Sequence, residues 1–185
     1  FVILDIGANI GFYSCLLSKL QHSNVQIYAF EPDTENCKRF RLNTNSLTNI
    51  TLISKALSSD HSERQLYISD QLNVDHRMYP SPNHTKTVVV PSTAVDIWMK
   101  EAIVFKIDLI KMDVQGAEMD ILKGAKETLK TCQDLILELQ HVEYNTGAPM
   151  NEEVISYLDG IGFRLVEGPF AEYSGDGDYH FTRYK

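Results

Sequence analysis

The sequence predicts an α/β fold built on a mostly parallel β-sheet. Short apolar runs of strand length alternate along the chain with segments of helical periodicity, which is the pattern of βαβ units. A glycine-containing turn at residues 5–11 joins the first of these runs to the first helical segment. With 185 residues, of which 43% are hydrophobic, the chain can bury the core of a single domain. We therefore expect one domain over residues 1–185, interrupted by a small β insertion over residues 58–98.

The opening of the chain is typical of a strand, a sharp turn and a helix. Residues 1–4 are apolar and too few for a buried helix, which favours a core strand. The helical segment that follows places five residues on one face: Phe12, Tyr13, Leu16, Leu17 and Leu20. Gly7 permits the positive φ of a tight turn, and Gly11 allows the helix to pack closely on the strand. The start of a helix also offers free N–H groups to an anionic ligand.

The spacing of these glycines indicates which ligand the turn accepts. A dinucleotide-binding turn has a middle glycine that lets the backbone approach a pyrophosphate, but residues 8–10 contain none. Glu31 stands 20 residues after Gly11, at the end of a second strand over residues 26–30, where an acidic residue can bind ribose hydroxyls. A nucleoside that carries a carboxylate, S-adenosylmethionine, meets these requirements better than NAD. Glycines that serve only packing remain the alternative.

The middle of the chain first continues and then breaks this rhythm. After Pro32, Asp33 or Thr34 can cap a second helix, and residues 50–54 form a third strand. Within the insertion we expect strands at residues 65–68 and 86–90, the second ended by Pro91. Between them, residues 70–85 are polar and aperiodic, which in a compact domain indicates a functional lid or a mobile segment.

Regular alternation resumes in the last third. A strand over residues 108–114 leads into a helix with a buried face: Ala117, Ile121, Leu122, Ala125 and Leu129. A strand at residues 134–139 and a helix at 151–161 follow. The chain closes with strands at residues 163–166 and 179–184, joined by a hairpin-type connection at 174–178.

Charge and cysteine content restrict the partners and the compartment. A net charge of −8 argues against a nucleic-acid partner, and no apolar run is long enough for a membrane span. The three cysteines, Cys15, Cys37 and Cys132, show no pairing pattern, and the first two lie in predicted helices as small buried hydrophobes. A reducing, cytoplasmic location is the simplest inference. The numbering begins on a strand without a Met, so we also expect a missing upstream segment.

Three blocks together resemble a known family. They span residues 5–11, 30–32 and 110–118, and the third, Ile-Lys-Met-Asp-Val-Gln-Gly-Ala-Glu, is the most specific. The chain resembles the FkbM family of S-adenosylmethionine-dependent methyltransferases from residue 1 to about residue 166. The resemblance implies a Rossmann-like, doubly wound, seven-stranded sheet of the class I methyltransferase type, whose last strand is antiparallel. It also implies methyl transfer, mostly to hydroxyls of sugars, polyketides and similar natural products.

The resemblance also assigns residues to the cofactor. It places these around S-adenosylmethionine: Asp5, Gly7, Ala8, Asn9, Gly11, Ser14, Glu31, Ala56 and Asp113. Glu31 would take the ribose hydroxyls, and Ala56 would line the adenine end. Residues 75–77 resemble a segment of some members, which makes His76 and Arg77 candidate contacts for a small-molecule or glycan acceptor.

Candidate catalytic residues gather at the strand ends. Asp113 and Glu118 match the acidic pair of the family's third block, whereas Gln115 stands where the family often has Glu and receives no charge role. A family strand that ends in Glu-Leu-His or similar is here Glu138-Leu139-Gln140, and His141 comes one residue later. The carboxyl ends of parallel strands form one mouth, so the first candidates for the base that deprotonates an acceptor hydroxyl are Asp113, Glu118, Glu138 and His141.

Other interpretations of the same residues remain open. These four side chains can also ligate Mg or Mn, but no ligand spacing requires a metal, and we predict none. An NAD-dependent oxidoreductase is disfavoured by the missing middle glycine and by the lack of a recognisable catalytic set. A non-catalytic S-adenosylmethionine-binding protein is the third possibility, which the acidic strand ends disfavour.

Overall fold

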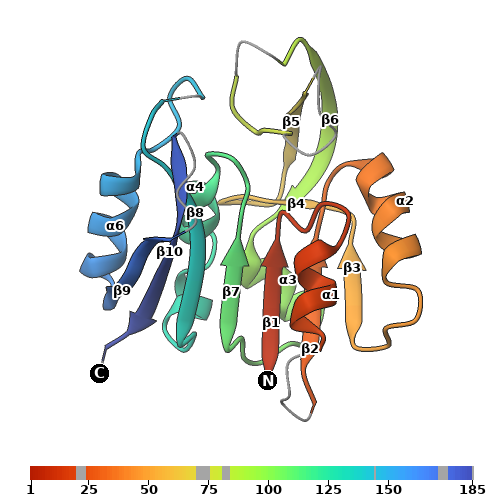
Figure 1. The fold of residues 1–185 in the computed structure, drawn as a ribbon, viewed down its shortest axis with the longest axis horizontal. Helices are drawn as coiled ribbons and strands as arrows, with labels where there is room; N and C mark the ends of the chain where they lie inside the picture. The colour runs from red at the N-terminus through yellow and green to blue at the C-terminus, as the bar shows by residue number, and fades with distance from the viewer. Residues whose placement is uncertain (20–23, 70–75, 81–83, 144, 171–174, 185) are drawn as a thin grey trace.

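The computed structural model describes residues 1–19, 24–69, 76–80, 84–143, 145–170 and 175–184. Its centre is a seven-stranded sheet in the order β3-β2-β1-β7-β8-β10-β9 (Figure 1). The strands are β1 (Val2–Ile6), β2 (Gln26–Phe30), β3 (Ile50–Ile53), β7 (Leu109–Met112), β8 (Asp134–Gln140), β9 (Phe163–Phe170) and β10 (Asp176–Arg183). The pairs from β3 to β8 are parallel, and β10 is antiparallel to both β8 and β9. The predicted fold class, including the antiparallel last strand, is confirmed.

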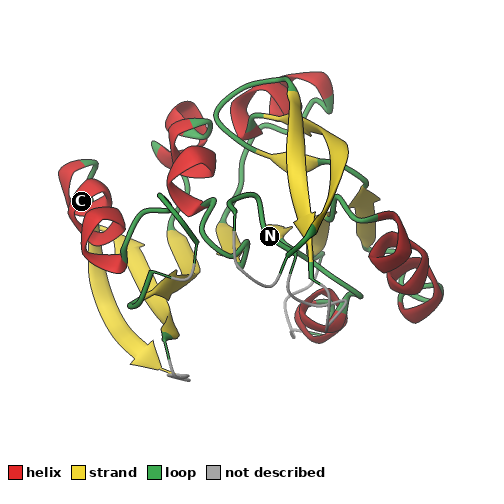
Figure 2. Ribbon diagram, turned by 90° about the horizontal axis from the view of Figure 1, so that it is seen from above, coloured by secondary structure: helices red, strands yellow, loops and turns green. Residues whose placement is uncertain are grey.

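Helices cover both faces of this sheet (Figure 2). They are α1 (Phe12–Leu17), α2 (Thr34–Asn43), α3 (Val95–Glu101), α4 (Glu118–Lys123), α5 (Lys126–Leu129) and α6 (Asn151–Gly160). The main core joins the sheet to α3, α4, α5 and α6. On the opposite face, Leu17 of α1 packs on Ile3 and Ile27, and Phe40 of α2 packs on Ala29. The predicted doubly wound arrangement follows from this division of the helices.

The insertion forms a second, three-stranded sheet. Its strands are β4 (Ala56–Leu57), β5 (Glu63–Ile68) and β6 (Lys86–Thr93), in the order β4-β6-β5. The expectation that Pro91 ends a strand is wrong, because β6 continues through it to Thr93 with Pro91 paired opposite Glu63. Proline removes only its own N–H from the ladder, and the N–H of Ser92 restores the pairing by donating to the Ser62 carbonyl at 2.8 Å.

Several helix and strand boundaries differ from the predictions. The helix expected after Gly116 is divided into α4 and α5 at Gly124, where a Cβ would lie 2.2 Å from the Ser58 carbonyl oxygen. The close approach of the insertion therefore fixes a glycine there. Helix α3 was not predicted, β9 extends to Phe170, and β10 begins at Asp176, inside the predicted connection. Residue 174 of that connection lies outside the described residues.

The apolar face expected for α1 points largely toward solvent. Phe12 is 70% exposed and Leu16 is 56% exposed, whereas Ser14 is fully buried. The Ser14 hydroxyl donates to the Asp5 carboxylate at 2.6 Å, and this buried hydrogen bond sets the rotation of the helix. Leu20, the last member of the predicted face, lies outside the described residues.

The three cysteines are free thiols. Cys37 and Cys132 are buried, but Cys15 is only partly buried, so the prediction for Cys15 is wrong. It lies on α1, most of whose apolar side chains face outward. Among the helices that the structure describes, none is both long enough and apolar enough to cross a membrane.

Candidate active site

The candidate site lies beyond the carboxyl ends of β1, β2 and β7. Strands β1 and β7 pair directly, with Ile6 opposite Met112. The chain leaves β1 toward α1 on one face of the sheet and leaves β7 toward α4 on the other. This divergence opens a crevice between the two connections, which is the usual ligand position in an open α/β sheet. The pairing of β1 with β7 places Asp113 beside the turn that follows β1.

Gly7 is required by the geometry of this crevice. Its φ is 78°, and a Cβ at this position would lie 1.8 Å from the carbonyl oxygen of Asp113. The turn from β1 and the loop after β7 thus approach each other as only glycine permits. Gly11 also has a positive φ, of 90°, but its neighbour is the ring of Phe40 on α2, at 3.0 Å from a Cβ. The expectation that Gly11 lets the helix pack on the strand is therefore wrong, because Gly11 allows close packing of α1 against α2.

Glu31 is a buried carboxylate fixed by backbone donors. Its Oε2 accepts the Asn9 N–H at 2.9 Å, and its Oε1 accepts the Asp33 N–H at 2.8 Å. Of the two predicted caps, Asp33 rather than Thr34 is the N-cap of α2, and it accepts the Asn36 N–H at 2.8 Å. Burial raises the pKa of Glu31 to about 7 against the opposing effect of these hydrogen bonds. Each carboxylate oxygen retains a second lone pair that can accept a ligand hydroxyl.

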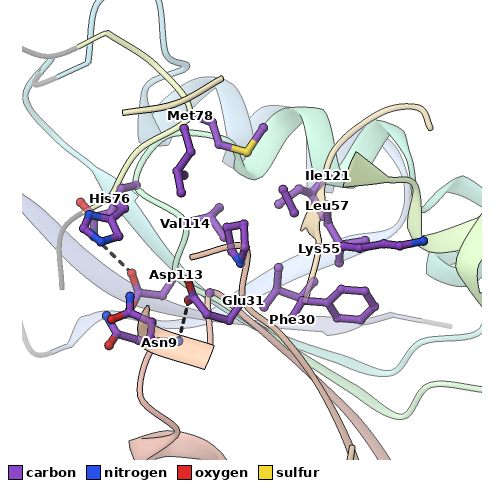
Figure 3. Close-up of a pocket in the computed structure, with 17 residues that line it drawn as sticks. Asn9, Phe30, Glu31, Lys55, Leu57, His76, Met78, Asp113, Val114 and Ile121 are labelled. Carbon is purple, nitrogen blue, oxygen red and sulfur yellow. Dashed lines mark hydrogen bonds between the residues drawn. The ribbon is translucent and has the colours of Figure 1, made fainter. Parts of the chain in front are cut away.

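Together these residues enclose a pocket, the cofactor pocket below (Figure 3). Its volume, including the part open to solvent, is about 630 Å³. Its lining includes six of the predicted site residues: Gly7, Asn9, Glu31, Ala56, His76 and Asp113. Apolar side chains from Phe30, Pro32, Leu57 and Ile121 line the same pocket. An apolar wall next to a fixed carboxylate suits a nucleoside, with the base on the wall and the ribose on Glu31.

The other predicted cofactor residues lie behind this lining. Ala8 and Gly11 shape the turn, whereas Asp5 and Ser14 form the buried hydrogen bond beneath it. Burial raises the pKa of Asp5, and the nearby ammonium of Lys111 opposes that shift. These residues support the turn rather than line the pocket.

Lys111 is a buried cation that we did not predict. Its Nζ lies 3.4 Å from Oδ2 of Asp113, 3.8 Å from Oδ1 of Asp5 and 4.4 Å from the centre of the Tyr13 ring. Burial alone would lower the pKa of Lys111, but the Asp113 and Asp5 carboxylates outweigh it and raise that pKa. The sequence could have indicated this role, because Lys111 stands inside an apolar strand and a lysine is rarely buried without a partner.

Gln115 connects the acidic side chains at the ends of β7 and β8. Its Nε2 donates to Oε2 of Glu138 at 2.6 Å and to Oδ1 of Asp113 at 3.2 Å. Burial, followed by the charge of Asp113, raises the pKa of Glu138 to about 9. Burial alone would also raise the pKa of Asp113, but Lys111 and the hydrogen bonds from Glu138 and Gln115 lower it. At neutral pH Glu138 is therefore protonated and Asp113 is ionised.

Glu118 and His141 lie outside the cofactor pocket. Glu118 is buried in the first turn of α4, accepts the Gly116 N–H at 3.1 Å, and has its pKa raised by burial to about 7. It lines a smaller cavity, the second cavity below, whose lining is Gln115, Gly116, Glu118, Glu138, Gln140, Asn145 and Asp176. His141 lines neither cavity. Its Nε2 is 3.2 Å from the hydroxyl of Tyr179, and the two rings stack.

The two loop candidates have different positions. His76 lines the cofactor pocket, and its ring points toward Asp113 (Figure 3). Its Nδ1 accepts the Ser69 N–H at 3.3 Å, so neutral His76 carries its proton on Nε2. Arg77 does not line the pocket and donates to Oδ1 of Asn145 at 2.8 Å. Residue 75, from the same sequence match, lies outside the described residues.

The described part of the predicted lid is fixed to the body of the protein. Besides Arg77, the Tyr79 hydroxyl donates to Asp120 of α4 at 2.9 Å, and the Thr146 N–H donates to the Pro80 carbonyl at 3.1 Å. Residues 70–75 and 81–83, on which the prediction of mobility also falls, lie outside the described residues. Over the residues that are described, we find no group of three or more His, Cys, Asp or Glu side chains arranged to hold a metal ion.

Comparisons with known proteins agree with this geometry. Residues 5–165 match the family described as the methyltransferase FkbM domain. The chain is 30% identical over 180 residues to the 2-O-methyltransferase NoeI of Sinorhizobium fredii, covering 89% of this chain and 73% of that protein. It is 25% identical over 140 residues to the hexuronic acid methyltransferase AglP of Haloferax volcanii, covering 75% of this chain and 55% of that protein.

Solved structures show the same fold. A methyltransferase FkbM from Methylobacillus flagellatus superposes with a TM-score of 0.66 and 17% identity, over 98% of this chain and 44% of that one. SMU.1697c from Streptococcus mutans, a methyltransferase-like protein solved in complex with S-adenosylhomocysteine (SAH), gives a TM-score of 0.59 at 11% identity, over 99% of this chain and 88% of that one. The match over residues 5–165 covers most of the sequence, so this chain belongs to the FkbM family of methyltransferases.

Proposed function

We propose that this protein transfers a methyl group from S-adenosylmethionine to a hydroxyl oxygen of a sugar or another small acceptor. The observation that carries the proposal is the cofactor pocket, in which the Gly7 turn, Glu31, Ala56 and Asp113 line one space. The names of NoeI and AglP, a 2-O-methyltransferase and a hexuronic acid methyltransferase, support a carbohydrate acceptor. The distant fold neighbour solved with SAH supports the choice of cofactor.

The residues of the pocket divide the binding of the cofactor among them. When bound, S-adenosylmethionine supplies the methyl group as an electrophile on its sulfonium. Glu31 accepts hydrogen bonds from the ribose hydroxyls, and Ala56 and the apolar wall enclose the adenine. The Gly7 turn lets the backbone approach the amino-acid part, and the buried bond between Ser14 and Asp5 holds that turn in place.

The acceptor hydroxyl needs a base, and the positions and pKa shifts of the candidate residues favour Asp113. Asp113 lines the cofactor pocket and has a lowered pKa, so it is ionised at neutral pH and can accept the proton. Glu138 already holds a proton at that pH. His76 lines the same pocket with its ring directed toward Asp113, so it would help to position the groups that meet the acceptor. Glu118 and His141 then act through their neighbours and do not touch the reacting atoms.

Two further expectations belong to this proposal. We expect no nucleic-acid partner, because binding to phosphates requires a basic surface and this protein has a net charge of −8. A reducing, cytoplasmic location stays a prediction, supported by three free cysteines, two of them buried.

The direct test is calorimetry with SAH and NAD side by side. We expect micromolar binding of SAH and no saturable binding of NAD at the same concentrations. This contrast also tests the alternative of an NAD-dependent oxidoreductase. Tight binding of NAD without binding of SAH would overturn the proposal.

A further inference from the structure

We propose that Asn145 is a positioning residue for methyl transfer. Its side-chain amide joins the lid segment, residues 76–80, to the β7 turn, residues 113–116, and so fixes the surroundings of Asp113. This inference rests on the proposed function, in which Asp113 accepts the proton of the acceptor hydroxyl. Asn145 acts through other residues and does not touch the reacting atoms.

The Asn145 amide is buried and bonded at both ends. Only 1% of the residue is exposed. Its Oδ1 accepts a hydrogen bond from Nη1 of Arg77 at 2.8 Å, and its Nδ2 donates to the carbonyl oxygen of Gln115 at 2.9 Å. A guanidinium can only donate and a carbonyl can only accept, so these two partners fix the orientation of the amide. Joining the two segments therefore requires a side chain that has both a donor and an acceptor.

The β7 turn has a backbone conformation that needs support. Gln115 has a φ of 56°, in the left-handed region that residues with a side chain rarely adopt. Such a conformation persists where neighbouring groups hold it. Gly116 follows with a φ of 106°, and a Cβ there would lie 3.0 Å from Nδ2 of Asn145, so the turn packs directly against this amide. The bond from Asn145 to the Gln115 carbonyl thus stabilises the turn where it is strained.

The same turn positions the groups that meet the acceptor. The Gln115 side chain donates to Oδ1 of Asp113 at 3.2 Å and to Oε2 of Glu138 at 2.6 Å. A rotation of the Gln115 backbone would carry this donor away from both carboxyl groups. At the other end of the amide, Arg77 directly follows His76, whose ring points toward Asp113 (Figure 3). Loss of the connecting amide would therefore displace groups on two sides of Asp113, and small displacements of reacting groups lower rates strongly.

The connection that carries Asn145 is also held by bonds that do not involve this side chain. The Ala148 N–H donates to the Asn145 carbonyl at 3.0 Å. Nε2 of Gln140 donates to the carbonyl oxygens of Ala148 and Pro149 at 3.2 and 3.0 Å. A substitution of the Asn145 side chain leaves these bonds in place. We therefore expect its effect on the reaction to exceed its effect on the fold.

The main test is Asn145→Asp, which keeps the size of the side chain. The variant retains an oxygen for Arg77 and places a second oxygen opposite the Gln115 carbonyl, where the wild type has a donor. The single-turnover rate of methyl transfer from isotope-labelled S-adenosylmethionine excludes product release, and calorimetry gives the dissociation constant of SAH. We expect the rate to fall at least tenfold and the dissociation constant to stay within threefold, because Glu31 and the Gly7 turn are unchanged.

The acceptor in this assay is whichever of three probes the wild type methylates fastest: the methyl glycosides of glucose, glucosamine and glucuronic acid. Asn151→Asp is the matched control, because it makes the same chemical change at the start of α6, where Nδ2 of Asn151 donates to the Tyr179 hydroxyl at 3.1 Å. This control should leave the rate unchanged.

Two further variants separate positioning from folding. Asn145→Ala adds no charge and should also lower the rate at least tenfold. The double variant Asn145→Asp/Gln115→Ala tests the route of the effect. Because Asn145 acts through Gln115, adding Asn145→Asp to Gln115→Ala should lower the rate by less than a further threefold.

Three results would overturn the inference and leave the proposed function standing. One is a rate within threefold of wild type in Asn145→Ala, because a fall in Asn145→Asp alone would then come from its added charge. The others are a loss of SAH affinity as large as the loss of rate, and a full tenfold loss added to Gln115→Ala, since both indicate a general structural role. If the wild type binds SAH and methylates none of the three probes, the carbohydrate part of the proposed function fails and the inference fails with it.

Discussion

The two sides of the site are built in different ways. On the side of β1 and β2, the turn at Gly7 and the carboxylate of Glu31 are fixed by backbone groups close to them in the chain. On the side of β7, β8 and β10, Glu138 and Asp178 meet only through strand pairing, and a side-chain amide connects Glu138 to Asp113. The first side is fixed by local backbone bonds and, under the proposed function, binds a nucleoside, whereas the second depends on strand register and on proton sharing. The first side therefore suits a constant cofactor, and the second can vary with the acceptor.

The largest expected effect lies on the acceptor side. Asp113→Asn should lower turnover by about 10²–10⁴-fold, because it removes the ionised group that accepts the hydroxyl proton. Affinity for SAH should stay within a few-fold, since Glu31 and the Gly7 turn are unchanged. Steady-state rates and calorimetry on the same preparation measure both quantities, with Glu63→Gln as the control. Glu138→Gln should lose less, because Glu138 is already protonated at neutral pH.

Normal turnover in Asp113→Asn would show that the base lies elsewhere. The variants Glu118→Gln and His141→Ala test the other two candidate bases by the same measurement of turnover. We expect smaller losses from both, because Glu118 bonds to Gly116 and His141 to Tyr179 rather than to the pocket. A loss in His141→Ala equal to that in Asp113→Asn would contradict the ranking of candidate bases.

A smaller effect should appear in the pH dependence of stability. The pKa of Glu138 is raised from 4.5 to about 9, so between these values the folded protein keeps a proton that the unfolded chain has lost. The contribution of Glu138 to the free energy of unfolding therefore falls as pH rises from about 4.5 to 9. In Glu138→Gln this loss is absent, and the melting temperature of the variant relative to wild type should rise between pH 6 and pH 9.

Glu118 provides the matched comparison for this titration. Its pKa is raised from 4.5 only to about 7, so its contribution is lost between those values and changes little above them. Thermal melts of Glu118→Gln should differ from wild type by a nearly constant amount from pH 8 to pH 9. An equal pH dependence in wild type and Glu138→Gln over that interval would contradict the shared proton.

The smallest effect concerns the loop that carries His76. Arg77→Met removes the bond to Asn145, so hydrogen exchange over residues 76–80 should become several-fold faster, whereas exchange in β1 should not change. Arg64→Met, which removes an ion pair with Asp60 in the same insertion, is the control. We also expect cofactor and acceptor together to slow exchange over residues 70–85. Exchange that is the same with and without both ligands would remove the lid role.

The cofactor side could be predicted largely from sequence because its determinants are local. A glycine turn, an acidic residue 20 positions later and a capping Asp33 each act on the backbone within a few residues. The mostly parallel, doubly wound sheet followed from the alternation of strands and helices, and its antiparallel last strand followed from the resemblance. The face of α1 was not predictable in this way, because the side of the helix that faces the sheet includes the polar Ser14, which donates to the buried Asp5.

The acceptor side was predicted only in part because its determinants are tertiary. Asp113 and Glu138 could be placed at adjoining strand ends, but nothing local shows that Gln115 spans the distance between them. Asp178 lies 40 residues after Glu138 in the sequence and meets it only through antiparallel pairing. The role of Lys111 likewise depends on Asp5, which is brought beside it by the pairing of β1 with β7.

One titration tests most directly the claim that the two sides have separate roles. The dissociation constant of SAH is measured by calorimetry for wild type, Glu31→Ala and Glu138→Gln under the same conditions. We predict that Glu31→Ala weakens binding by about 1.5–3 kcal/mol, roughly 10- to 150-fold, because it removes charge-assisted hydrogen bonds to the ribose. Glu138→Gln should stay within a few-fold of wild type. Equal weakening in both variants, or no weakening in Glu31→Ala, would contradict the account.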